Sequence, residues 1–438
     1  MGRALLVALL ALSLLVSGPP SAVAEPVPAV EPQATAAGTF VPLPTPVRLL
    51  DTRSGIGTPA GRLGNQAAIR VPVSSIGIPS TAAAVVVNVT AVKPTAPGFV
   101  TVYPWTGGTP PVVSNLNFVA DDVVPNLAAV KLGSAASIGF LTCLQGTTDL
   151  VADVAGYYIG GTATVNGAFV AITPQRLLDT RATVRLDPYS AIPLRVAGAG
   201  GVPSTGVGSV FVNATVTDPT AAGFLTLYPF GATSPPTSNV NFRAGQTVPN
   251  LASVKLGSGH LMVANSSPKP IHVIIDVFGY VLANDQATQV GSFVPLTPTR
   301  TYDSRQTDQG IYTPSEPPVG FVFPKGVQAA VLNVTVTNPT APGYLVVYPA
   351  APSPLDPSHT ICQSPPPASN LNYDAGEAVA NLVTTATGGP GNVACVRPES
   401  GGNTHFILDL AGVYVNPATF AAGVDLSSTG IMTVIGRR

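Results

Sequence analysis

The stretch Arg48-Leu49-Leu50-Asp51-Thr52-Arg53 decides how this chain is divided, because the chain contains it three times. It returns as Arg176-Leu177-Leu178-Asp179-Thr180-Arg181 and, with substitutions, as Arg300-Thr301-Tyr302-Asp303-Ser304-Arg305. The three aspartates lie 128 (179 − 51) and 124 (303 − 179) residues apart. A period of this length is the size of a domain and is too long for a solenoid repeat.

Each copy opens a segment that ends on an aspartate followed closely by glycine and tyrosine. These closing stretches are Asp153-Val154-Ala155-Gly156-Tyr157, Asp276-Val277-Phe278-Gly279-Tyr280 and Asp409-Leu410-Ala411-Gly412-Val413-Tyr414. The chain therefore consists of three repeats, and we expect each repeat to own a hydrophobic core.

The residues between the two signatures predict β-strands. A run of β-branched residues around an asparagine (Asn88, Asn213 or Asn333) leads through a short Pro/Gly turn into a second apolar run that ends in Tyr-Pro, which indicates a hairpin. A Ser-Asn-x-Asn-aromatic segment follows and supplies Asn117, Asn241 and Asn372. With seven or eight short strands in roughly 115 residues and no amphipathic helix, the pattern predicts an all-β chain of three tandem antiparallel β-sandwich domains. Jelly-roll and immunoglobulin-like topologies both fit.

Composition limits the classes of function. The 438 residues suffice for about three domains at ~150 residues each. Charged residues make up 9% of the chain, against ~25% in an ordinary soluble domain. A net charge of −1 leaves no electrostatic footprint for nucleic acid or for an anionic membrane.

The N-terminus has the features of a secretory signal peptide. Arg3 precedes an apolar run over residues 4–16, and Ala22-Val23-Ala24 is a small-residue cleavage site. The apolar run is shorter than a membrane-spanning helix requires, so we expect no membrane span. The predicted organisation is a signal peptide (1–24), a Pro/Ala-rich leader (25–39), repeats 1, 2 and 3 (40–160, 168–283 and 292–416) and a C-terminal tail (417–438).

The chain has three cysteines, an odd number for an exported protein. Cys362 and Cys395 belong to the same repeat, and we predict a disulfide between them. Cys143 lies in an apolar, strand-like run, and we expect it to be a free buried thiol, with intermolecular pairing as the alternative.

Taken together, these motifs resemble a module of secreted and cell-surface proteins of high-GC Gram-positive bacteria. They are the Arg-Leu-Leu-Asp-Thr-Arg opening, the Asn-Val-Thr strand, Tyr-Pro, Asn-Leu-Asn-Phe and the Asp-Val-x-Gly-Tyr-Tyr closure, and they cover nearly all of residues 40–416. The module occurs in tandem and has no established activity. The resemblance implies a secreted, extracellular or wall-associated location and says little about chemistry.

A recurring polar set is the main candidate site. Aspartates and amides could bind Ca²⁺ or a sugar, because their oxygens suit hard cations and hydroxyls. The alternative, which the recurrence favours, is structural: the charges pair and the amides satisfy backbone groups. The set comprises Asp51, Arg53, Asn88, Asn117, Asp153, Asp179, Arg181, Asn213, Asn241, Asp276, Asp303, Arg305, Asn333, Asn372 and Asp409, together with Asn115 and Asn126.

Aromatic residues after the hairpin offer a second possibility. Tyr103, Trp105 and Tyr228 could stack on a sugar, although packing at the end of a sheet is the more ordinary role. Catalytic motifs are lacking, and the four histidines, His260, His272, His359 and His405, share no repeat position. We therefore expect a non-catalytic surface protein without a cofactor, acting in structure or adhesion, or alternatively in binding cell-wall glycan or other surface proteins.

Overall fold

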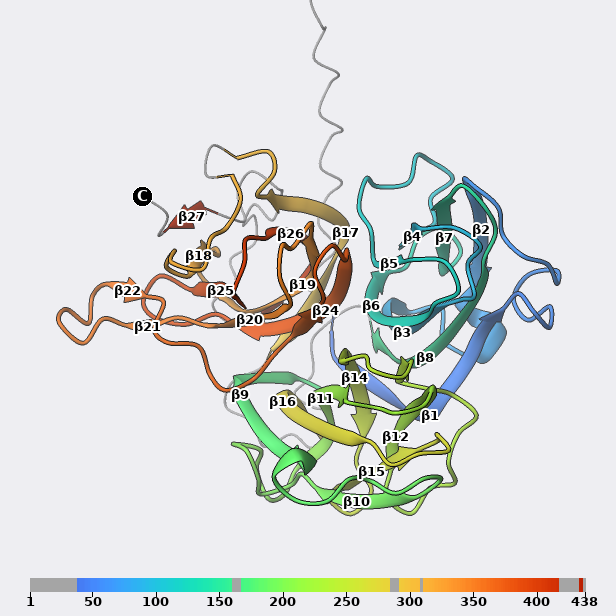
Figure 1. Cartoon of the computed structure of the whole chain (residues 1–438), viewed down its shortest axis with the longest axis horizontal. Coiled ribbons are helices and arrows are strands. Elements are labelled where there is room, and N and C mark those ends of the chain that lie inside the picture. Colours follow the sequence, from blue (N-terminus) through green and yellow to red (C-terminus); the bar gives the residue numbers. More distant parts are fainter. Residues whose placement is uncertain (1–37, 160–166, 284–290, 308–309, 417–432, 436–438) are drawn as a thin grey trace, which may run out of the picture. The chain divides into compact units, whose positions relative to one another are not determined.

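The computed structural model describes residues 38–159, 167–283, 291–307, 310–416 and 433–435. The predicted signal peptide and most of the predicted leader and tail lie outside the described residues. Figure 1 colours repeat 1 blue to teal, repeat 2 green to yellow and repeat 3 orange to red.

Each repeat folds into strands joined by turns. In repeat 1 these are β1 (Phe40–Asp51), β2 (Ala67–Pro72), the 3₁₀ turn η1 (Val73–Ile76), β3 (Ala82–Val92), β4 (Gly98–Pro104), β5 (Leu116–Phe118), β6 (Val123–Lys131), β7 (Ser137–Leu144) and β8 (Asp149–Ile159). In repeat 2 they are β9 (Phe169–Asp179), the 3₁₀ turn η2 (Thr180–Ala182), β10 (Ala191–Arg195), β11 (Val207–Thr217), β12 (Gly223–Pro229), β13 (Val240–Phe242), β14 (Val248–Lys255), β15 (His260–Asn265) and β16 (His272–Leu282).

Repeat 3 keeps this order and carries an insertion. Its strands are β17 (Ser292–Asp303), β18 (Val319–Val322), β19 (Val327–Thr337), β20 (Gly343–Pro349), β21 (Ala351–Pro352), β22 (Thr360–Ile361), β23 (Leu371–Tyr373), β24 (Val379–Ala386), β25 (Val393–Ser400) and β26 (His405–Val415). β27 (Thr433–Ile435) pairs with β18 from within the predicted tail. β21 and β22 form the small hairpin of the insertion.

The chain of each repeat alternates between two antiparallel sheets. The inner sheets contain the opening and closing strands and have the orders β1-β8-β3-β6, β9-β16-β11-β14 and β17-β26-β19-β24. The outer sheets have the orders β2-β7-β4-β5, β10-β15-β12-β13 and β27-β18-β25-β20-β23. Each repeat's two sheets share one hydrophobic core.

The prediction of an all-β chain is confirmed, but the prediction of three tandem β-sandwich domains is wrong. The six main sheets are the small antiparallel blades of one six-bladed β-propeller (Figure 1). The described residues all belong to a single compact unit. A fourth core joins the inner sheets of all three repeats, so the repeats do not form separate domains.

The strand β3 shows why the repeats merge. Val85, Val87 and Val89 face the core of repeat 1, whereas Ala84 and Val86 face the shared core. Both faces of the inner sheet are therefore buried, which explains a near-continuous apolar strand without polar alternation.

Aromatic side chains fill much of the shared core. Phe40, Phe169 and Phe293, one from each opening strand, are buried there together with Tyr158 and Tyr414. The ring of Phe169 stacks on that of Tyr414 with centroids 4.3 Å apart, and the ring of Phe293 lies 4.3 Å from that of Tyr158. These contacts cross repeat boundaries and hold the propeller together. Within the described residues, no helix has the length and apolarity needed to cross a membrane.

Candidate functional site

The motifs of each repeat meet in one row across its inner sheet. In repeat 1, Arg48 is opposite Asp153, which is opposite Asn88, which is opposite Leu127. The register aligns Arg176, Asp276, Asn213 and Leu251 in repeat 2 and Arg300, Asp409, Asn333 and Leu382 in repeat 3. Motifs separated by about a hundred residues in sequence are thus neighbours in the sheet.

The first arginine of the opening motif binds the closing aspartate. Arg48 Nε lies 2.5 Å from Asp153 Oδ1, and Arg48 Nη1 lies 2.7 Å from Asp51 Oδ2. Burial raises the pKa of Asp153, and the hydrogen bonds from Arg48 oppose that rise. Burial also raises the pKa of Asp276 and Asp409, which Arg176 and Arg300 bind in the same way. Asp153, Asp276 and Asp409 are therefore structural acceptors for an arginine.

The last arginine of the motif folds back onto the aspartate before it. Arg181 donates from its backbone N–H and Nε to Asp179 Oδ1 and from Nη2 to Asp179 Oδ2. These bonds hold the pKa of Asp179 down at about 2. Arg53 and Arg305 bind Asp51 and Asp303 in the same way and lower the pKa of each carboxyl.

The residue between the aspartate and the last arginine of each motif carries a hydroxyl group, and this hydroxyl bonds to the residue at the start of the closing strand. Thr52 bonds to Asp149, Thr180 to His272 and Ser304 to His405. The expectation that the histidines share no repeat position is therefore wrong, because His272 and His405 begin equivalent strands. Asp149 at the matching position of repeat 1 concealed the correspondence in the sequence.

The asparagines of the row reach into the next repeat. Asn88 Nδ2 donates to the Ser238 carbonyl over 2.9 Å, and Asn250 Nδ2 donates to Asn88 Oδ1 over 2.8 Å. Asn250 Oδ1 in turn accepts the N–H of Leu127 over 3.2 Å. Repeats 1 and 2 are thereby fastened by buried amides.

The same contacts recur at the other two joints and close a cycle, which we call the asparagine relay. Asn213 and Asn381 join repeat 2 to repeat 3, and Asn333 and Asn126 join repeat 3 to repeat 1. Asn115, with its counterparts Asn239 and Asn370, accepts a backbone N–H of the neighbouring strand. Most of the recurring polar set is thus committed to holding the fold.

Asn117, Asn241 and Asn372 are different, because they line a cavity that we call the three-repeat cavity. It has a volume of about 410 Å³ and is lined by residues of all three repeats. Asn241 Nδ2 bonds to the Ser238 hydroxyl and Asn372 Oδ1 to the Ser369 hydroxyl, while Asn117 Nδ2 has no partner among the described residues. These half-buried amides retain hydrogen-bonding capacity toward a ligand.

Aromatic and charged groups complete the three-repeat cavity. Tyr344 is 40% exposed, and Tyr373, which also lines the cavity, is buried. Arg243 of repeat 2 lies 3.0 Å from Asp122 of repeat 1, and burial raises the pKa of Asp122. Glu377 of repeat 3 also lines the cavity. Amides, an aromatic face and a few charges are the chemistry of a polar small-molecule site.

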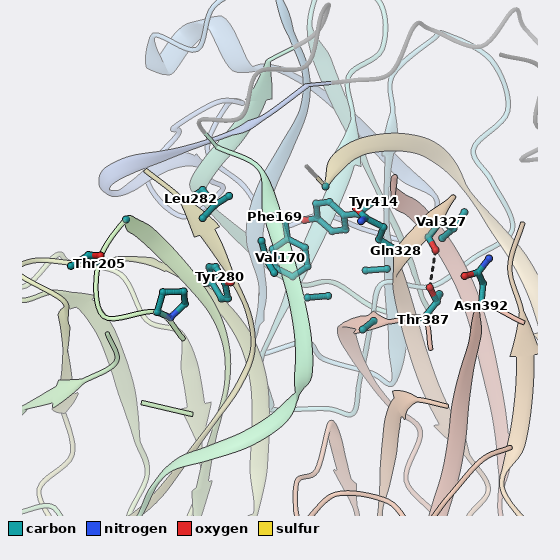
Figure 2. A pocket seen from close by; sticks show the side chains of 16 residues that line it. Phe169, Val170, Thr205, Tyr280, Leu282, Val327, Gln328, Thr387, Asn392 and Tyr414 are labelled. Atoms are coloured by element: carbon teal, nitrogen blue, oxygen red, sulfur yellow. Dashed lines mark hydrogen bonds between the residues drawn. The ribbon is translucent and has the colours of Figure 1, made fainter. Parts of the chain in front are cut away.

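A larger cavity of about 660 Å³ lies between repeats 2 and 3. Figure 2 shows Tyr280 and Phe169 from repeat 2 opposite Gln328, Thr387 and others from repeat 3. The Thr387 hydroxyl donates to the Val327 carbonyl over 2.7 Å. Gly291, one of its lining residues, directly follows residues 284–290, which lie outside the described residues, so we assign the cavity no ligand.

The aromatic residues proposed for stacking are not brought to these cavities. Tyr103 and Tyr228 are buried, and burial raises the pKa of Tyr103. A Cβ atom on Gly139 would lie 2.6 Å from Cζ of Tyr103 and 2.9 Å from Cε3 of Trp105, so both rings pack on that glycine. Their role in the structure is packing.

The cysteines fall into two environments. Cys362 and Cys395 form a disulfide that fastens the insertion of repeat 3 to β25. Cys143 is a free thiol, but it is half-buried rather than buried as expected, and Gln66 Nε2 lies 3.4 Å from its sulfur.

The site contains residues that sequence reasoning missed. Arg48, Arg176 and Arg300 bind the closing aspartates, whereas the candidate set from the sequence contains only the last arginine of each motif. The signal was present, because the first arginine occurs in every copy. Among the described residues there is no group of three or more His, Cys, Asp or Glu side chains that could hold a metal ion.

Comparison with known proteins adds little. No family model matches the chain, and no curated protein matches it. Among solved structures, a chain from the atomic structure of Sulfolobus Turreted Icosahedral Virus is similar over 86% of this chain and 91% of its own length, with 10% sequence identity and a TM-score of 0.16. A TM-score this low carries no argument about fold or function.

Proposed function

We propose that this protein is a non-catalytic, exported surface protein that binds carbohydrate of the cell wall in the three-repeat cavity. One observation carries the proposal: three equivalent amides line a single cavity and take no part in the asparagine relay. They belong to Asn117, Asn241 and Asn372. Carboxamides both donate and accept hydrogen bonds, which suits sugar hydroxyls. Tyr344 offers a partly exposed ring on which a sugar can stack.

The signal-like N-terminus and the resemblance to surface modules of high-GC Gram-positive bacteria support the exported location. The commitment of Asp51, Asp153 and their counterparts to arginine partners supports a non-catalytic role, because these carboxylates would otherwise be the first candidates for acid–base chemistry.

The test compares two matched variants, one in which a tyrosine is replaced and one in which a phenylalanine is replaced. Binding is measured on a glycan array and in a pulldown with purified cell wall. Tyr344 and Phe224 are equivalent residues of β20 and β12, paired with Asn372 and Asn241 and similarly exposed, at 40% and 38%. Only Tyr344 lines the three-repeat cavity. We expect Tyr344→Ala to weaken glycan binding by about tenfold and Phe224→Ala to leave it unchanged. Equal losses in both variants, or no glycan retained by the wild type, would overturn the proposal.

A structural or adhesive role without a small ligand is the second candidate. The cyclic asparagine relay favours it, since buried amides at every joint make a rigid body suited to a spacer. In that case the protein would still sediment with cell wall or with other surface proteins, and Tyr344→Ala would have no effect on this.

A further inference from the structure

A cavity of about 510 Å³ lies at the joint between repeats 1 and 3, and we call it the repeat 1–3 cavity. Repeat 1 contributes the strands β4 and β7 and the loop that carries Val112. Repeat 3 contributes the two arginines of its opening motif, Arg300 and Arg305, together with Ile407.

The arginines give the repeat 1–3 cavity a donor-rich end. Arg305 uses Nε and Nη2 on Asp303, and its Nη1 has no partner among the contacts of the described residues. Arg300 Nη1 lies 3.7 Å from Asp303 Oδ2, whereas the equivalent distances are 2.7 Å in repeat 1 and 3.1 Å in repeat 2. One guanidinium nitrogen of each arginine is thus available, while Asp303 and Asp409 are already engaged by these same side chains.

Two further polar groups lack partners here. The hydroxyl of Thr335, a residue only 3% exposed, makes no hydrogen bond with the described residues. The Nδ2 of Asn117 is likewise without a partner among the described residues, whereas the Nδ2 of its counterpart Asn241 donates to the Ser238 hydroxyl. Leaving a buried polar group unpaired is unfavourable, so the two groups add to the polar character of this part of the wall.

The rest of the wall is apolar. Phe99 and Leu141 line one side of the repeat 1–3 cavity, and Ile407 lines the other. Val112 is 87% exposed on the loop at the cavity. Hydrogen-bond donors beside an apolar wall favour a ligand that has hydrogen-bond acceptors at one end and a hydrocarbon chain along the rest of its length.

We propose that the repeat 1–3 cavity binds a carboxylic acid with an aliphatic chain. Its carboxylate accepts hydrogen bonds from Arg300 and Arg305, as a planar guanidinium binds a carboxylate. Its chain lies along Phe99 and Leu141. Asn117 and Ala378 line both cavities, but the two arginines that bind the carboxylate line only the repeat 1–3 cavity. The proposal therefore does not depend on carbohydrate binding in the three-repeat cavity.

Cys143 provides a built-in reporter for the test. It lines the repeat 1–3 cavity and is the one cysteine of the three that is outside the disulfide. A thiol-reactive maleimide will therefore label the non-reduced, full-length protein at Cys143. We expect decanoate to slow this labelling in a saturable manner, while decanol, which has the same chain without the carboxylate, protects at least tenfold less well.

Charge variants at Val112 test the head group without disturbing the fold, because Val112 is exposed. We expect Val112→Glu to weaken decanoate protection severalfold by like-charge repulsion and Val112→Lys to preserve or strengthen it. Arg305→Gln should reduce protection about tenfold or more, and Arg181→Gln, the matched change in repeat 2, should not. Equal protection by decanol, equal effects of the two charges at Val112, or no protection at all would overturn the proposal. Because labelling is measured without any glycan, these results are independent of the carbohydrate test.

Discussion

The ring of Phe169 occupies the space that a side chain at Gly279 would need. A Cβ atom on Gly279 would lie 2.3 Å from Cζ of Phe169. The same approach joins Gly156 to Phe40 at 2.3 Å and Gly412 to Phe293 at 2.5 Å. The phenylalanine near the start of each repeat and the glycine near its end are thus two halves of one contact, and this explains the glycine of the closing motif.

Gly279→Ala should destabilise the protein by about 1–3 kcal/mol, because the added methyl group overpacks the shared core. Denaturant unfolding of the full-length protein will measure the change. The double variant Gly279→Ala/Phe169→Leu should recover part of the loss by making room. Gly64→Ala is the control, since a Cβ atom there meets nothing within 4 Å. A normal unfolding midpoint for Gly279→Ala would contradict the packing argument.

Asn250→Ala should lower the free energy of unfolding by about 3 kcal/mol. Asn250 is fully buried, and its loss leaves the Leu127 N–H without its bond to Asn250 Oδ1 and Asn88 Oδ1 without its donor. A double-mutant cycle with Asn88→Ala should give a coupling energy of about 0.5–3 kcal/mol, since the two side chains are bonded across the joint. Additive effects would show that the relay does not couple the repeats.

Asp179 should make the protein sensitive to acid. Its pKa in the folded protein is about 2, held below its ordinary value of 3.8 by the hydrogen bonds from Arg181. The charged form therefore contributes stability above about pH 4, and this contribution is lost as the pH falls through about 2. Because both side chains are partly exposed, we expect Asp179→Asn to cost only about 1 kcal/mol at neutral pH.

The gap between wild type and Asp179→Asn should then close as the pH approaches 2, measured by chemical unfolding across that range. Asp187→Asn, a change at an exposed carboxylate, serves as the control. A gap that does not vary with pH would show that Asp179 acts by packing rather than by charge.

Reduction of the disulfide between Cys362 and Cys395 should destabilise the protein by roughly 3–4 kcal/mol in the chain-entropy model, because the bond closes a loop with a sequence separation of 33. Thermal unfolding of Cys362→Ser/Cys395→Ala will measure the loss without a reductant. Cys143→Ser should leave the melting temperature nearly unchanged. An unchanged melting temperature for the double variant would mean that the insertion is held by its other contacts.

The sequence was sufficient to predict the strands and the repeats, but not how the repeats associate. The β-branched run of β3 correctly indicated a strand, and the turn residues marked its end. The run Ala84-Val85-Val86-Val87 lacks the alternation of apolar and polar residues that a sheet with one solvent-exposed face shows. This absence was the sign in the sequence that both faces of the strand are covered. Side chains of the other two repeats, among them Phe169 and Phe211, lie with Ala84 and Val86 in the shared core. A period in the sequence does not specify such contacts.

The structural role of the polar residues could be predicted from the sequence, but their hydrogen-bond partners could not. Recurrence favoured a structural role for Asp153 and Asn88, and both are used in holding the fold. The distinction between Asn88 and Asn117 could not be made from the sequence, because both recur in every repeat and both follow strand-like residues. Only the three-dimensional arrangement shows that the Asn88 amide is paired across the joint while the Nδ2 of Asn117 has no partner among the described residues.

The closed asparagine relay also constrains how such a protein can evolve. Every repeat already has a neighbour on each side, so no open end exists at which a fourth copy could be added. Solenoids lengthen by gaining repeats, whereas here the copy number is fixed at three by the closure. Variation is then confined to loops and joints, and repeat 3 shows one outcome, an added hairpin fastened by its own disulfide.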